Sequence, residues 1–226
     1  LKSHLNIKTS LVSTRCTQDI HLNNLLKWNQ KKDVSLETIL NQFQYVQITD
    51  IVKYIREISD SLFNILITHD NEQVSDQVYQ ALLGIIDSLS KKQFSKFREV
   101  VDDYVDNFFH FPQPQVHKWL LHSLIKSLTY DNDKRKEKEV SKSLRAFHYM
   151  FRFIVISRRN CEEASAKMMS ASEFVSQTEK VFQLLNSVIS IPDNTALIAA
   201  QDQMLKFIGP LFEVMATIFP SDNHAL

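Results

Sequence analysis

Apolar side chains recur every three or four positions along most of this 226-residue chain. The spacing is clearest between Ile51 and Ile65 and again between Val74 and Leu89. Both stripes are wider than the seam of a two-stranded coiled coil, so each segment faces neighbours on more than one side. Because an α-helix turns once in about 3.6 residues, this pattern predicts amphipathic helices that bury a broad face.

Cap residues and helix breakers divide the pattern into about eight or nine helices. Predicted N-caps are Asp19, Ser35, either Thr49 or Asp50, and Ser172, while Pro114 is expected in the first turn of its helix. The expected helices lie near residues 19–28, 35–43, 50–66, 74–89, 94–108, 114–128, 140–159, 172–189 and 194–220, with a polar connector at 130–139 and a break at Gly209–Pro210.

The spacing of the predicted helices indicates how they pack. Short loops favour antiparallel neighbours, and helix pairs of about 40 residues are typical of armadillo and HEAT repeats. A single pair cannot bury both of its apolar stripes, so stacking must supply the core. We therefore predict an all-α fold, an irregular α-solenoid of stacked helical hairpins. The helical-repeat scaffold domain covers residues 19–226, and a short extended segment, residues 1–18, precedes it.

Composition narrows the classes of protein that fit. With only 2 Gly and 5 Pro, the chain has few of the residues that β-hairpins and phosphate-binding loops require. One of the two glycines, Gly84, could allow two helices to cross closely. Twenty-six basic and 26 acidic residues balance, which argues against nucleic-acid binding. Cys16 and Cys161 are far apart and fit a reducing compartment, so we expect a cytoplasmic protein.

The ends and the hydropathy of the chain give two further expectations. No apolar run reaches the roughly 20 residues that span a bilayer, and the first residues lack a signal-peptide pattern. The chain does not begin with Met, which we interpret as an excised piece of a longer protein.

No set of residues predicts catalysis, a cofactor or a metal site. His117 and His122 are five positions apart, about 140° around a helix, so they point to different faces and are expected to be ordinary histidines. Cys161 has no histidine nearby in the sequence to activate it. Asp102 and Asp106 lie in an acidic cluster that is most simply a solvated helix face, or alternatively a rim for a basic partner.

Two groups of basic residues form the candidate interaction surface. Either group could contact anionic lipid, at about 1 kcal/mol per exposed basic residue, and the alternative for each is an ordinary solvated surface. The first group consists of Lys91, Lys92, Lys96 and Arg98, and the second of Lys134, Arg135, Lys136 and Lys138.

Several motifs occur in a recognisable order along nearly the whole chain. They are Ser13–Asp19 continuing to Trp28, Asp50–Ile55 continuing to Ile65, Lys92–Phe97 with Tyr104, Ala146–Val155 continuing to Arg158, and Leu211–Pro220. Together they resemble the DOCK family of exchange factors for Rac and Cdc42, and the similarity is strongest to the branch that acts with ELMO on Rac.

The resemblance implies a position and a role. In that family this region is an armadillo-like helical scaffold between a C2-type lipid-binding domain and the nucleotide-exchange domain. The implied full-length protein is a guanine-nucleotide exchange factor for Rac-like small GTPases that drives actin remodelling and is recruited to the plasma membrane by its other domains. The exchange domain matches nothing in this chain, so the chain itself is predicted to be non-enzymatic, with its flanking domains as partners and with ELMO and Rac as partners of the full-length protein. Direct lipid binding is the alternative function.

Overall fold

The computed structural model describes residues 16–129, 134–162, 169–191 and 195–216, which contain eleven α-helices and two short 3₁₀ helices and no strand. All but the last three residues of the predicted extended segment, 1–18, lie outside these ranges. In chain order the helices are α1 (Ile20–Leu26), α2 (Leu36–Gln42), η1 (Phe43–Tyr45), α3 (Ile48–Lys53), α4 (Ile55–His69), α5 (Glu72–Ser90), η2 (Lys92–Phe97), α6 (Arg98–Asn107), α7 (Pro114–Leu128), α8 (Lys134–Glu162), α9 (Ala171–Ile189), α10 (Thr195–Leu205) and α11 (Ile208–Ala216).

Side-chain caps begin several of these helices. The carboxylate of Asp19 accepts a hydrogen bond from the Leu22 amide at 2.8 Å, and the Ser35 hydroxyl accepts one from the Thr38 amide at 3.2 Å. Both caps were predicted, as was Pro114 at the first position of α7. These contacts satisfy amide groups that have no partner inside the helix, which explains why the helices begin where they do.

The helix predicted from Thr49 or Asp50 to about residue 66 is wrong in two respects. It begins at Ile48, after Gln47, and it is interrupted at Tyr54, whose backbone angles (φ −116°, ψ 24°) are not helical. The apolar spacing continues through the break, since Ile51 of α3 and Ile55 and Ile58 of α4 are all buried. Periodicity therefore could not reveal the break.

Three other predicted boundaries also differ from the structure. α8 begins at Lys134, inside the predicted connector at 130–139, because Lys, Arg and Glu are good helix formers even where no apolar stripe marks the helix. Ser170, not Ser172, caps α9. The last helical segment breaks at 206–207 rather than at Gly209–Pro210, and Pro210 lies in the first turn of α11, where a missing amide hydrogen is tolerated.

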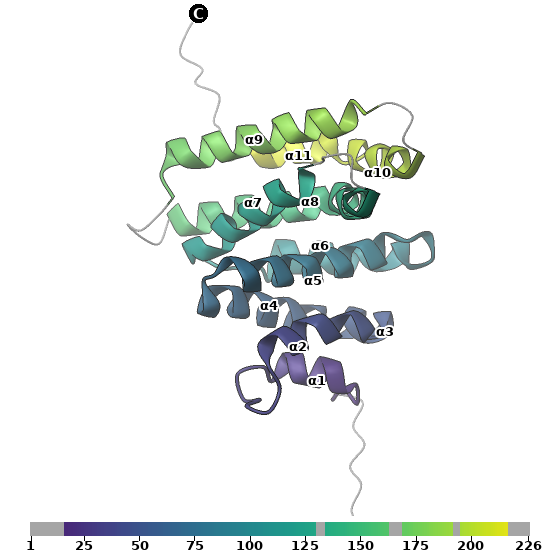
Figure 1. Ribbon diagram of the computed structural model, residues 1–226, viewed down its shortest axis with the longest axis vertical. Coiled ribbons are helices and arrows are strands. Elements are labelled where there is room, and N and C mark those ends of the chain that lie inside the picture. Colours follow the sequence, from purple (N-terminus) through teal and green to yellow (C-terminus); the bar gives the residue numbers. More distant parts are fainter. Residues whose placement is uncertain (1–15, 130–133, 163–168, 192–194, 217–226) are drawn as a thin grey trace, which may run out of the picture.

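The helices stack in layers along the long axis of the molecule, from α1 at one end to α9, α10 and α11 at the other (Figure 1). α8 is the longest helix, with 29 residues, and it packs on α5, α7, α10 and α11. α9 packs on α7, while α4 packs on α5. The predicted all-α solenoid of stacked helices is confirmed.

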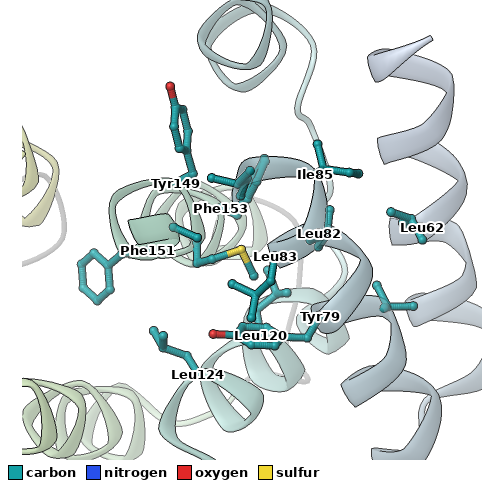
Figure 2. Close-up of a cluster of buried hydrophobic side chains, with 14 of the residues drawn as sticks. Leu62, Tyr79, Leu82, Leu83, Ile85, Leu120, Leu124, Tyr149, Phe151 and Phe153 are labelled. Carbon is teal, nitrogen blue, oxygen red and sulfur yellow. The ribbon is translucent and has the colours of Figure 1, made fainter. Parts of the chain in front are cut away.

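Large apolar side chains from four helices, α4, α5, α7 and α8, meet near the centre of the stack, as Figure 2 shows. Burial of these side chains stabilises the fold by about 25 cal/mol for each Å² of apolar surface removed from water. The labelled contributors include Tyr79, Leu82 and Leu83 of α5, Leu120 and Leu124 of α7, and Phe151 and Phe153 of α8, all buried. One cluster of buried apolar residues extends from Leu22 to Leu211, so successive layers share a core.

Polar contacts join the layers at defined points. The Tyr79 hydroxyl lies 2.9 Å from the hydroxyl of Ser127, which links α5 to α7 inside the core. Arg152 of α8 donates hydrogen bonds to both Asp102 and Asp106 of α6. The acidic cluster is therefore more than a solvated face, because it fixes the position of α6 on α8.

Candidate functional site

A cleft of about 610 Å³ opens over α5, between α2, η1 and α3 on one side and the first turns of α8 on the other. We call it the α5 cleft. Its floor includes Gln77, Gln80, Ala81 and Gly84, which follow one another along one face of α5 at helical spacing. The opposite face of the same helix is buried in the core, so α5 both holds the stack together and lines the cleft.

Gly84 leaves the middle of the floor open. A Cβ built at this position meets no atom within 4 Å, so the predicted close crossing of two helices is wrong. The consequence of the missing side chain is space in the cleft rather than close packing.

Three lysines line the α5 cleft from two helices. Lys91 caps the C-terminal end of α5, and Lys138 and Lys142 are one turn apart near the start of α8. Within the ranges that the structure describes, no ion pair or hydrogen bond involves the side chain of any of these three lysines. Their positive charges are therefore not neutralised by the protein.

The carboxylates around the α5 cleft are already engaged. Asp76 forms an ion pair with Lys126, and Asp87 accepts a hydrogen bond from Arg145 Nε at 2.7 Å. Glu139, at the rim, accepts one from the Gln80 amide at 2.6 Å. Because the two aspartates are paired with cations, the three lysines outnumber the remaining carboxylate, Glu139, and the cleft carries a net positive charge.

The structure therefore brings together one residue from each predicted basic group, Lys91 and Lys138. It adds Lys142, which sequence reasoning missed although its spacing of four from Lys138 places both on one helix face. Because sequence alone does not show that α5 and α8 are neighbours, the cleft could not be predicted.

The other predicted basic residues lie elsewhere. Lys96 is exposed on η2, outside the cleft, and Lys136 is half-buried on α8. Arg98 is half-buried, with its guanidinium carbon 5.3 Å from the centre of the Phe207 ring. The side chains of Lys92, Lys134 and Arg135 lie outside the part of the chain that the structure describes.

The family model for the dedicator of cytokinesis (DOCK) TPR region matches residues 32–225. This chain belongs to that family. The resemblance drawn from its motifs is thereby confirmed, and TPR repeats, like armadillo repeats, are stacked helical hairpins.

Individual relatives agree with the match to the DOCK TPR region. Dedicator of cytokinesis protein 3 of Mus musculus is 29% identical over 220 residues, which cover 96% of this chain and 11% of that protein. The Homo sapiens protein of the same name is 28% identical over the same length. Dedicator of cytokinesis protein 4 of Homo sapiens is 28% identical over 158 residues, 70% of this chain and 8% of that protein. The chain spans about a tenth of the length of the curated relatives that it matches.

His117 and His122 lie in different surroundings in this DOCK TPR region. His117 is fully buried beside Phe174, whereas His122 lies near Glu72 on the surface. Burial, with a smaller contribution from the Arg158 charge, lowers the pKa of His117 to about 4, so its ring is neutral. In the ranges that the structure describes, no three His, Cys, Asp or Glu residues are placed to hold a metal ion.

Two further features bear on chemistry and on membranes. Cys161, which has no histidine near it in the sequence, is buried near the end of α8. Burial shields its sulfur atom from reagents in solution. Among the described helices of this DOCK TPR region, none combines the length and the apolar composition that crossing a bilayer would need.

A second hollow lies between α9 and α11, with a volume of about 540 Å³. Val175, Phe182 and Met215 give it a largely apolar lining, and Glu179 is its one ionisable lining residue among those described. It offers neither a pair of catalytic groups nor a set of metal ligands.

Proposed function

We propose that this chain is a non-catalytic helical scaffold segment of a DOCK-type guanine-nucleotide exchange factor for Rac-like small GTPases. In this role it holds the flanking domains at a fixed spacing and offers a surface for protein interaction. The observation that carries the proposal is the continuous apolar core from Leu22 to Leu211 in a chain that belongs to the DOCK TPR region family.

The packing of the stack explains how it could act as a spacer. Each layer buries apolar area against the next, and ion pairs such as Arg145 with Asp87 join neighbouring helices. Bending the stack would expose apolar surface and separate these pairs. A solenoid of this kind is therefore stiffer than a polar linker of equal length.

The remaining parts of the proposal follow from the family. We infer that the full-length protein acts with ELMO on Rac, contributes to actin remodelling, and is cytoplasmic with recruitment to the plasma membrane through its other domains. The curated relatives are dedicator of cytokinesis proteins, and this chain corresponds to about a tenth of their length. The rest of such a protein is long enough to contain an exchange domain and a lipid-binding domain.

Nucleotide exchange on purified Rac tests the non-catalytic part. Rac loaded with fluorescent GDP should release it at the intrinsic rate when this chain is added. A DOCK exchange domain serves as the positive control and should accelerate release. Accelerated release by this chain alone would contradict the proposal.

The spacer role has its own test in the full-length protein. Replacing the stack with a Gly/Ser linker that reaches as far should reduce Rac activation in cells while the isolated exchange domain keeps its activity in vitro. Full activation with the flexible linker would show that fixed spacing is not required.

Lipid binding is the second candidate function, favoured by the exposure of Lys91, Lys96 and Lys138. Co-sedimentation with vesicles that contain anionic lipid tests it. Binding that weakens as salt is raised would support this function. Absent binding, or binding that salt does not change, would reject it.

A further inference from the structure

We propose that the α5 cleft binds an extended, acidic segment of a partner protein. An apolar side chain of that segment lies over Gly84, and its carboxylates bind Lys91, Lys138 and Lys142. This inference rests on the proposed scaffold function and names the chemistry of the partner for its interaction surface.

The shape of the cleft fits a peptide. Its volume of about 610 Å³ is that of an ordinary ligand site, and it lies in a groove between helices rather than on a flat surface. Ile48, Ile51 and Ile85 add apolar lining beside Ala81, and the space over Gly84 is free of neighbouring atoms. One or two apolar side chains of a partner can be buried there.

Amide side chains on both sides of the cleft indicate an extended segment. Asn41 and Gln44 line one side and Gln77 and Gln80 belong to α5. Each amide carries two N–H donors and an acceptor oxygen. Gln44 donates one hydrogen bond to the Asn41 carbonyl and Gln80 donates one to Glu139, which leaves each a second N–H and its oxygen. An extended backbone has N–H and C=O groups free to bind them, whereas a helix uses these groups internally.

The charges select an acidic partner. Lys91, Lys138 and Lys142 have no anionic partner within the described ranges, whereas Asp76 and Asp87 are paired with Lys126 and Arg145. A basic segment would meet uncompensated positive charge. A flat bilayer surface would need these lysines on one outer face, but they line a groove between α5 and α8.

Fluorescence anisotropy with a peptide library tests the inference. The probes are fluorescein-labelled peptides of about ten residues, roughly 33 Å when extended, in which Asp or Glu alternates with varied apolar residues. Acidic members should bind saturably, and the same peptides with Lys in place of Asp and Glu should not. The absence of any acidic peptide that saturates below about 1 mM would overturn the proposal.

Matched lysine variants assign the binding to the cleft. The triple variant Lys91→Gln, Lys138→Gln, Lys142→Gln should bind the best acidic peptide about tenfold more weakly. The control replaces three exposed lysines outside the cleft, Lys27, Lys32 and Lys180, by Gln and should bind like the unmodified chain. Equal weakening in both variants would show a non-specific charge effect and contradict the proposal.

Gly84 provides a test that leaves the charge unchanged. Gly84→Trp places a large side chain in the cleft and should abolish peptide binding, whereas Gly84→Ala should leave it unchanged. Circular dichroism should show equal helicity for both. Normal binding by a folded Gly84→Trp variant would place the peptide elsewhere.

Vesicles of phosphatidylcholine with phosphatidylserine separate the peptide from a lipid. If they bind with the same dependence on the three lysines while no acidic peptide binds, the cleft is a lipid site and the proposal is wrong. That result would leave the scaffold function intact, because the exchange and linker experiments do not depend on the cleft.

Discussion

The two faces of α5 show how one helix serves two purposes. On the core face, Tyr79, Leu82 and Leu83 are buried in the core that α5 shares with α4, α7 and α8. On the cleft face, Gln80 is exposed and Gly84 leaves open space. The side chains of the buried face are closely packed because neighbouring helices stack against them. The polar groups of the open face remain in contact with solvent and do not contribute to the core.

This difference predicts that stability and binding can be changed separately. Residues of the core face should alter the free energy of unfolding, and residues of the cleft face should alter binding.

Phe153 gives the largest expected effect. Its ring centre lies 4.8 Å from that of Phe109 and 5.2 Å from that of Phe63, so it joins α8 to α4 and to the chain before α7. Phe153→Ala should lower the free energy of unfolding by about 3–5 kcal/mol, measured by urea denaturation. Phe212→Ala is the control, because Phe212 is 58% exposed and its loss should cost less than about 0.5 kcal/mol.

Arg145 of α8 pairs with Asp87 of α5, a residue that also lines the α5 cleft. Arg145→Met leaves Asp87 partly buried without its cation, and the free energy of unfolding should fall by about 2–3 kcal/mol. The unpaired carboxylate also lines the cleft, so the acidic peptide should bind more weakly. Lys206→Met removes an exposed pair with Asp202 and should change stability by less than about 0.5 kcal/mol, and an equal effect of the two variants would contradict the argument.

The buried ring of His117 predicts a dependence on pH. Its pKa is lowered from 6.5 to about 4, so between these values the unfolded chain binds a proton that the folded chain does not. Stability is therefore complete above pH 6.5 and should fall by about 2 kcal/mol between pH 7 and pH 5 through this residue. The pKa of His148 is lowered in the same direction by burial and contributes to the same slope.

Unfolding by urea at a series of pH values measures the slope. His117→Leu should make it shallower, because the apolar replacement binds no proton and the ring nitrogens of His117 have no hydrogen-bond partner to lose. An unchanged slope in this variant would show that His117 is protonated in the folded chain.

Gly84→Ala is expected to have the smallest effect, and one of opposite sign. Ala is the better helix former, and its Cβ meets no atom within 4 Å, so thermal unfolding should show a gain of up to about 1 kcal/mol. Peptide binding should not change. A loss of stability would show that the helix needs glycine at this position.

The core face and the cleft face of α5 also differ in how far the sequence could predict them. The caps at Asp19 and Ser35 are local and were predicted, whereas the break at Tyr54 was not, since apolar spacing continues through it. The core stripes repeat along the chain and indicate the solenoid directly. The α5 cleft requires Lys91 and Lys138 to line the same cleft from two different helices. No local pattern in the sequence predicts which helices are neighbours.

The stiffness of the stack is the claim on which the scaffold role depends most directly. Ile20 on α1 is 67% exposed and Ile198 on α10 is 51% exposed, so each can carry a spin label on a Cys substitution, with Cys16 replaced by Ser. Pulsed electron spin resonance should give one narrow distribution of distances between the two labels. A broad distribution, or two separate distances, would contradict a rigid spacer.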